Sequence, residues 1–160
     1  MIALLASLLL QGSIPAIEAE TLAGKEVRLP QDLTSPHLMV VGFQRDHDDD
    51  LLAWVEGMGL KEAGAPPWYQ LTVLHERSGF VTFFIDNWMK AQIGDEALRE
   101  KVVMIYEDRQ AMANALGLSS DEVVGAMVVA PDGDILARAE GTYTEEAGKR
   151  LLAAASASSR

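Results

Sequence analysis

The sequence predicts an α/β fold with a central mixed β-sheet of about four to five strands, flanking helices and a β-hairpin at the N-terminal end. Apolar runs of strand length alternate with helix-like segments between residues 37 and 117, which is typical of parallel strands joined by crossover helices. A strong hairpin signal then follows at 122–141 and adds an antiparallel edge strand. The 160 residues suit one domain, expected over 17–155 and followed by a flexible tail at 156–160.

The first half of the chain shows the elements in order. The stretch IEAETLAGKEVRLP is typical of a short hairpin that turns at Ala23-Gly24 and is closed by Pro30. HLMVVGF is an almost unbroken apolar run, as expected of a strand that is covered on both faces. From Asp48 the apolar residues recur at helical spacing until a group of glycines ends the helix, and WYQLTVLHE is the next strand.

The second half carries the clearer local signals. After one broken or two short helices over 78–100, KVVMIYED is a third strand. DRQAMANALGL is a compact helix that Asp108 can cap and Gly117 can end. Two antiparallel strands meet at the turn 131–133, Pro-Asp-Gly, and the last helix starts either with a Thr142–Glu145 capping box or with Thr144 as its cap.

Composition removes several classes of function. The formal charge of −11 and the pI near 4.6 disfavour nucleic acid, because no basic stripe with interleaved aromatics offsets the repulsion from phosphates. The chain has no cysteine, which excludes disulfides, thiol redox catalysis and thiolate metal sites. No phosphate-binding glycine loop and no serine nucleophile motif occurs, and no cofactor is predicted.

The N-terminal run MIALLASLLL is apolar, uncharged and too short to span a bilayer. Residues 1–16 are therefore expected to be a secretory signal, which predicts a periplasmic or membrane-associated protein. No Lys or Arg precedes the run, so the alternative is a cytoplasmic protein with an apolar N-terminal element.

The order of elements resembles a thioredoxin-like domain of the kind found in peroxiredoxins and periplasmic thiol proteins, over residues 17–155. Laid on that pattern, QRDHDDDL occupies the turn where a reactive cysteine or a C-x-x-C motif would stand. Val124 falls at or near the site of the cis-proline that contacts disulfide substrates in such proteins. Both signatures are missing together, so the resemblance implies the fold without thiol exchange.

A narrower resemblance rests on VVGFQRDHDDDLLAW, FFIDNWMKAQI, KVVMIYED and GAMVVAPDGDILARAEG. These segments are similar to bacterial relatives of the mitochondrial assembly factor for the membrane sector of ATP synthase. That resemblance implies a cysteine-free thioredoxin fold that is used for binding.

The polar turn RDHDDD has a physical interpretation of its own. Asp48 is expected to cap the following helix, with Asp49 and Asp50 stabilising its positive N-terminal end. The alternatives are a metal or cationic ligand held by Asp46, His47 and Asp48, or a contact with a partner. None of the recognised ligand spacings is present, so no metal site is predicted.

The segment from Phe80 to Ile93 is the most informative non-catalytic feature. Phe80, Phe84 and Trp88 share one stripe at helical spacing, and a second apolar stripe lies beside it. This apolar arc is wider than one buried face needs. It belongs either to the core or to an exposed aromatic patch that contacts a partner or a membrane surface.

These observations favour a non-catalytic protein that binds a protein partner, one that could be membrane-embedded, and that assists assembly of a membrane complex. The expected partner-binding residues are Arg45, Asp46, His47, Asp48, Phe80, Phe84 and Trp88. The alternative is a degenerate peroxiredoxin-like or metal-dependent enzyme that works through the acidic turn at 45–50.

Overall fold

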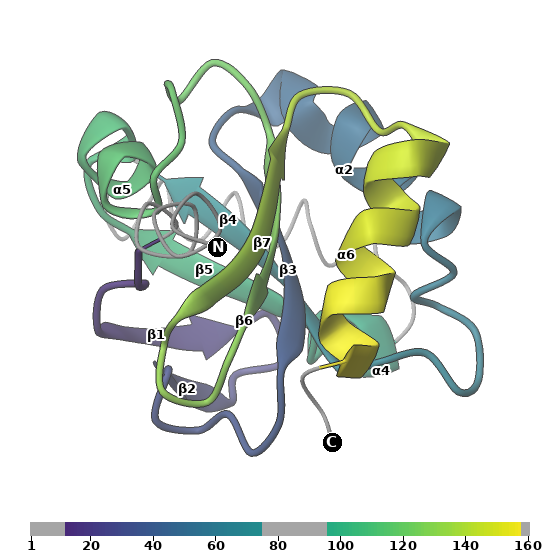
Figure 1. The fold of residues 1–160 in the computed structure, drawn as a ribbon. Coiled ribbons are helices and arrows are strands. Elements are labelled where there is room, and N and C mark those ends of the chain that lie inside the picture. The colour runs from purple at the N-terminus through teal and green to yellow at the C-terminus, as the bar shows by residue number, and fades with distance from the viewer. Residues whose placement is uncertain (1–11, 75–95, 158–160) are drawn as a thin grey trace.

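The computed structural model describes residues 12–74 and 96–157 (Figure 1). The expected signal segment up to residue 11 and the aromatic segment from Phe80 to Ile93 lie outside the described residues. The elements are β1 (Ile17–Thr21), β2 (Glu26–Leu29), β3 (His37–Gly42), a 3-10 helix η1 (Arg45–His47), α2 (Asp48–Gly57), β4 (Trp68–Leu74), α4 (Glu96–Arg99), β5 (Val102–Tyr106), α5 (Arg109–Ala115), β6 (Gly125–Val129), β7 (Ile135–Glu140) and α6 (Glu145–Ala157).

The strands form one mixed sheet in the order β2-β1-β5-β4-β3-β6-β7. The three central strands β5, β4 and β3 are parallel, as expected from their crossover connections. Within the described residues the sheet has seven strands instead of four to five, because both hairpins join it. The N-terminal hairpin pairs through Thr21 and Val103, and β6 lies antiparallel to β3, so the late hairpin contributes two strands and not one.

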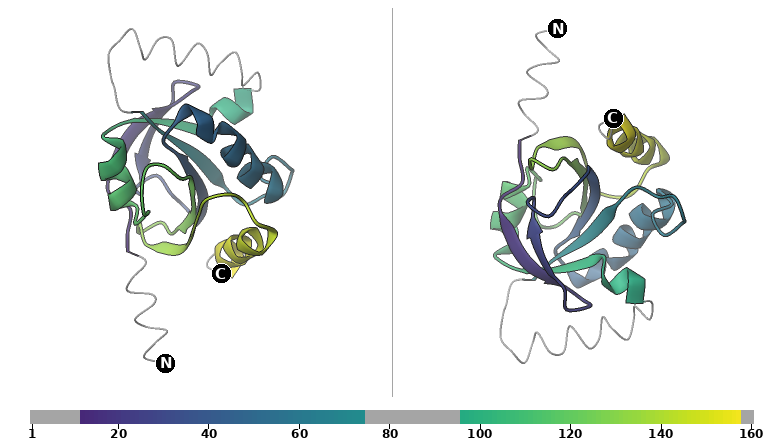
Figure 2. Two further views of the ribbon diagram at one scale, coloured as in Figure 1. Left: turned by 90° about the horizontal axis from the view of Figure 1, so that it is seen from above. Right: turned by 90° about the horizontal axis from the view of Figure 1, so that it is seen from below.

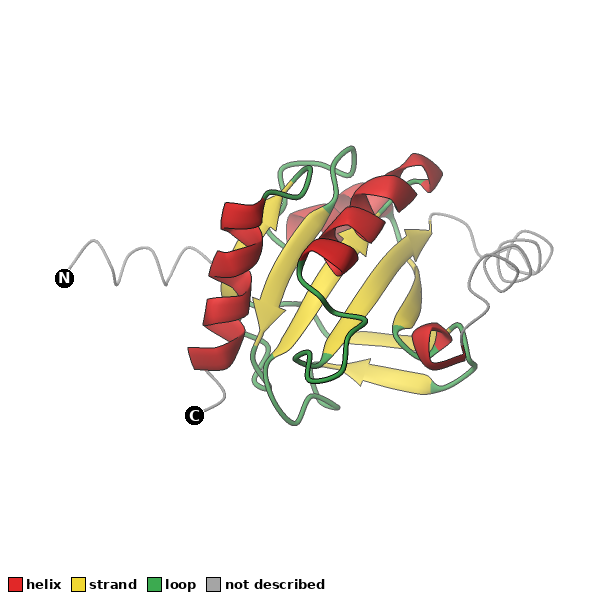
Figure 3. Ribbon diagram, turned by 90° about the vertical axis from the view of Figure 1, so that its right-hand side faces the viewer, coloured by secondary structure: helices red, strands yellow, loops and turns green. Residues whose placement is uncertain are grey.

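Helices cover both faces of the sheet. Figure 2 shows α5 on one side and α2 and α6 on the other, and Figure 3 shows α2 and α6 together on the near face. In β3, Met39 and Val41 pack toward α5 while Leu38 and Val40 pack toward α2 and α6. This alternation explains the unbroken apolar run, because each successive side chain enters one of two cores.

The ring of Tyr143 joins α2 to α6. It lies edge-on to the fully buried Trp54, with ring centroids 5.2 Å apart, and its hydroxyl donates to the carbonyl of Gly57 over 3.1 Å. A Cβ on Gly57 or on Gly148 would come within 2.3 Å or 2.7 Å of the ring. Both glycines are therefore required by the close approach of the aromatic ring.

The expected turn and cap residues are confirmed in the C-terminal half. The Asp108 carboxylate accepts from the amide of Ala111 at 2.8 Å, and Gly117 ends α5 with a φ of 75°. Gly133 takes a φ of 95° in the β6–β7 turn. Of the two alternatives for α6, the cap is Thr144, whose hydroxyl accepts from the amide of Ala147 at 3.2 Å.

The described chain enters the fold beside the β6–β7 turn. The amide of Ile14 donates to Gly133 over 2.9 Å, and Ile135 donates to the carbonyl of Gly12 over 2.9 Å. Ile14 is buried in the core on the α5 side. Within residues 12–74 and 96–157, no helix has the length and apolarity needed to cross a membrane.

Candidate functional site

The candidate site is the turn of residues 43–47, between the end of β3 and the start of α2. β3 is paired on both sides, with β4 and with β6, so its end is fixed in the middle of the sheet. Phe43 continues the strand into the core and is 2% exposed. The chain then makes one turn of 3-10 helix before α2 begins.

His47 holds this turn from inside. Its Nδ1 accepts from the backbone amide of Phe43 at 3.0 Å, and its Nε2 lies 3.1 Å from the carbonyl of Glu122. An amide can only donate and a carbonyl can only accept, so the ring is the neutral tautomer that carries its proton on Nε2. The side chain is 5% exposed. His47 therefore works as an internal tie between the turn and the loop before β6.

A second group of contacts joins the same two loops to α5. The Gln44 amide donates to the carbonyl of Asp121 over 3.1 Å. Arg109 donates to the carbonyl of Phe43 over 3.4 Å, and its Nε lies 3.8 Å from the Asp121 carboxylate. The Asp121 amide in turn donates to Gln110 over 3.3 Å. These bonds and those of His47 make the turn a well-connected part of the fold.

The acidic residues of the turn lie at the surface. Asp46, Asp48 and Asp49 are exposed, and Asp50 is half-buried. The expectation that Asp48 caps α2 is wrong: the N-cap is His47, with no side-chain capping bond, because the 3-10 turn continues directly into the helix. Asp48, Asp49 and Asp50 all lie in the first turn of α2. Their negative charges stabilise the helix there by interacting with the positive end of its dipole.

A metal site built on Asp46, His47 and Asp48 is incompatible with this geometry. Both ring nitrogens of His47 already have backbone partners, and coordination of a metal would break one of these bonds. Among the residues that the structure describes, no three His, Asp or Glu side chains are grouped so that they could hold a metal ion.

Val124 lies immediately before β6, where the resemblance predicted the missing cis-proline. It is 1% exposed, its carbonyl accepts from the amide of Gly141 at 2.8 Å, and it packs in the core beneath α2 and α6. In the described part of the chain, the cis peptide bond is Leu29-Pro30 and not one at Val124. A buried apolar side chain therefore occupies this position.

The structure brings Asp46, His47 and Asp48 together in one turn, and Arg45 begins the 3-10 helix. The predicted candidates Phe80, Phe84 and Trp88 lie outside the described residues. The sequence did not indicate that Gln44, Arg109 and Asp121 belong to the site, because they are far apart in the chain. The one available signal was the fold resemblance, which places the turn beside the loop before β6.

A half-buried aromatic pair lies at the opposite end of β3. His37 stacks on Tyr69 with ring centroids 5.4 Å apart, and its Nδ1 donates to the carbonyl of Ser35 over 2.9 Å. Burial lowers the pKa of His37 and the nearby Lys101 lowers it further, against the opposing effect of the Ser35 bond. Burial, together with the Asp32 carboxylate, raises the pKa of the Tyr69 phenol. Both shifts favour the neutral form of the side chain.

The structure matches a known fold over most of its length. The fold is thioredoxin-like. The structure resembles the exposed lipoprotein thioredoxin of Streptococcus pneumoniae with a TM-score of 0.59 and 16% identity, covering 87% of this chain and 98% of that one. The thioredoxin domain of a thiol-disulfide oxidoreductase from Bacteroides vulgatus gives 0.59 and 16%, covering 91% and 96% of the two chains.

A third neighbour, described as a putative electron transport protein of Aquifex aeolicus, gives a TM-score of 0.62 and 13% identity over 91% of this chain and 97% of that one. No protein-family model and no curated protein matches the sequence. At these identities the likeness shows the fold alone. This chain itself has no cysteine.

Proposed function

We propose that this protein is a non-catalytic thioredoxin-like protein that binds a protein partner through the surface of residues 44–50, which comprise most of the turn and the first residues of α2. The observation that carries the proposal is the position of His47. Its ring lies inside the site and forms hydrogen bonds with the turn and with the loop before β6. A thiol enzyme needs a reactive sulfur at this position, whereas His47 is committed to two structural bonds. A fixed turn suits recognition, because little conformational entropy is lost on binding.

The chemistry of the turn suggests the kind of partner surface. Asp46, Asp48 and Asp49 are exposed carboxylates on one turn. Charged groups at such a position act mainly on association rate and specificity, and they favour a partner with Lys or Arg at the matching place. The net charge of −11 also attracts a positively charged partner, and it acts at longer range.

The partner that we propose is a protein of a membrane complex, which this protein helps to assemble on the outer side of the cytoplasmic membrane. Support comes from the apolar run at 1–10 and from the resemblance to the bacterial relatives of the ATP synthase assembly factor. One structural neighbour is itself described as an exposed lipoprotein. The aromatic segment with Phe80, Phe84 and Trp88 is part of the proposed contact region.

Site-specific photo-crosslinking in native membranes tests the proposal. A photoreactive residue at Asp49, exposed in the proposed surface, should give one discrete crosslinked protein that mass spectrometry identifies as a membrane protein. The same residue at Glu18, exposed on the outer hairpin, is the matched control and should not capture it.

Charge variants then separate recognition from folding. The triple variant D46N/D48N/D49N should lower capture by about tenfold, and E18Q/E20Q/E26Q, with the same change in charge, should not. Three outcomes would contradict the proposal. They are equal crosslinking at Asp49 and Glu18, an equal loss of capture in both triple variants, and no crosslinked product at all. Peroxide consumption by the pure polypeptide would replace it with the enzyme alternative.

A further inference from the structure

The strand β2 is an edge strand of the sheet, next to β1 (Figure 1). Where the two strands pair, the carbonyl of Lys25 accepts from the amide of Thr21 at 2.8 Å, so the backbone of Lys25 faces β1. Because inward and outward residues alternate in an antiparallel ladder, the backbone groups of Val27 also face β1. The backbone groups of Glu26 and Arg28 therefore point outward, away from the sheet.

Asp32 occupies both outward groups of Arg28. Its carboxylate accepts from the Arg28 amide at 2.8 Å, and its own amide donates to the Arg28 carbonyl over 2.8 Å. The next outward position is Pro30, which has no amide to donate. Within residues 12–74 and 96–157, no further strand pairs with the outward side of β2. Glu26 is thus the outward residue of β2 that Asp32 does not cover.

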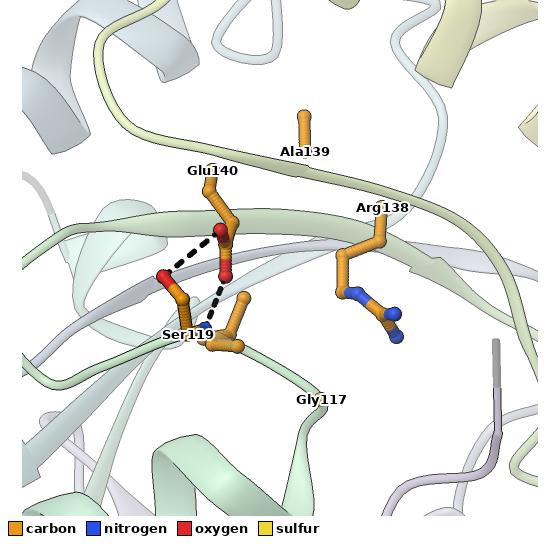
Figure 4. Close-up of a pocket in the computed structure, with 6 residues that line it drawn as sticks. Gly117, Ser119, Arg138, Ala139 and Glu140 are labelled. Carbon is orange, nitrogen blue, oxygen red and sulfur yellow. Dashed lines mark hydrogen bonds between the residues drawn. The ribbon is translucent and has the colours of Figure 1, made fainter. Parts of the chain in front are cut away.

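The other edge strand, β7, is contacted by more distant parts of the chain. The carbonyl of Gly12 accepts from the amide of Ile135 at the start of β7. Figure 4 shows the end of β7 beside a cleft of about 420 Å³, where the Glu140 carboxylate accepts from the amide and the hydroxyl of Ser119. The β2 edge differs, because the residue that covers it follows the strand closely in the chain.

The sequence of β2 is complementary to itself in one antiparallel register. When two copies of β2 are centred on Val27, Glu26 of each copy lies opposite Arg28 of the other, so both outward pairs have opposite charges. Both side chains are exposed. Centring on Glu26 or on Arg28 would oppose like charges, and centring on Arg28 would also place Pro30 in the ladder. The favourable register therefore uses the outward groups of Glu26 and Arg28 in both copies.

We propose that Asp32 is a built-in stop that prevents β2 from pairing with β2 of a second copy of this chain. Arg28 belongs to both outward pairs of the register centred on Val27, so every backbone bond of that register needs a group that Asp32 occupies. A second copy gains these bonds only when the Asp32 bonds break, so pairing brings little net stabilisation. Exposed strand edges are sites of association in general, and Asp32 closes this one.

Sedimentation velocity over a range of protein concentrations, with circular dichroism as the check on folding, tests this stop. The wild type should show no pairing through β2, whereas D32A frees the Arg28 amide and should self-associate at least about tenfold more tightly. D32P removes the carboxylate and the backbone amide at this position together, so it should associate more tightly than D32A. D108A is the matched control, because Asp108 also accepts from a backbone amide at 2.8 Å but lies at a helix N-terminus. It should associate no more than the wild type.

Charge variants in the D32A background identify the register. Adding E26R places two positive charges opposite each other and should reverse the gain, and adding R28E to that variant should restore it. Hydrogen exchange by NMR gives a second readout at the Arg28 amide. Its protection should be present in the wild type, lost in the D32A monomer and regained in the D32A dimer.

The proposal is overturned if D32A and D32P both associate no more tightly than the wild type. It is also overturned if D108A associates as strongly as D32A, because the gain would then come from lost stability and not from the edge. A D32A dimer that survives E26R, or a loss that R28E does not restore, would equally reject pairing through β2. If D32P fails to fold, D32A and the exchange of its Arg28 amide still decide the question.

Discussion

Replacing His47 tests whether the turn is held from inside. In H47L both backbone partners lose their bonds, and leucine fills a similar volume without a polar atom. The Phe43 amide is buried, so leaving it unpaired costs about 1 to 3 kcal/mol. The Glu122 carbonyl lies closer to solvent and can accept from water, which limits its loss to about 1 kcal/mol. We expect the free energy of unfolding to fall by about 2 to 4 kcal/mol in total.

Two isosteric variants divide this loss between the two bonds. The carbonyl oxygen of asparagine lies near the position of Nδ1, so H47N should keep the Phe43 bond and recover more than half of the loss. The amide nitrogen of glutamine lies near the position of Nε2, so H47Q should keep the Glu122 bond alone and recover less. This order follows from the deeper burial of Phe43.

The measurement is urea unfolding followed by circular dichroism, combined with hydrogen exchange of the Phe43 amide by NMR. Leu52→Ala on the exposed side of α2 is the control for changes in the helix alone. Protection of the Phe43 amide should be lost in H47L and kept in H47N. An H47L protein as stable as the wild type, with the Phe43 amide still protected, would refute the reasoning.

Three further perturbations have defined outcomes. G148A should lower the free energy of unfolding by about 1 to 3 kcal/mol in chemical unfolding, because the new methyl group meets the Tyr143 ring. In a Y143A background the same G148A change should cost less, because the ring is gone. The lowered pKa of His37 means that the unfolded chain binds the proton more tightly than the folded one, so His37 weakens the fold as pH falls through 6.5 toward its lowered value. H37Q should accordingly lose less melting temperature than the wild type across that window. D108A removes the α5 cap and should cost about 1 kcal/mol in urea unfolding, with a result below about 0.3 kcal/mol arguing against the cap.

Features set by neighbouring residues were predictable from the sequence. The strand His37–Gly42, the Gly133 turn and the Asp108 cap each depend on residue types within a few positions, and all three are confirmed. The number of strands was not predictable in this way. It depends on the pairing of Thr21 with Val103, which are far apart in the chain and have no local signal in common.

The same distinction applies to the candidate site. Its place after β3 followed from the alternation of strands and helices, and the exposed acidic side chains followed from the composition of the turn. The role of His47 could not be predicted, because its partner Glu122 lies 75 residues away and the bond uses a backbone carbonyl that any residue would offer. The expected Asp48 cap was wrong because sequence does not show that a 3-10 turn leads into α2.

The described chain enters the fold at the end of the sheet that lies opposite the acidic turn. Gly12 and Ile14 lie beside the β6–β7 turn, next to the His37 end of β3, whereas the acidic turn follows Gly42 at the other end. The six residues of β3 separate these ends by about 20 Å. Residue 12 therefore lies at the end of the sheet opposite to residues 44–50. A domain immobilised on a sensor surface through residue 12 should therefore leave residues 44–50 open to a soluble analyte.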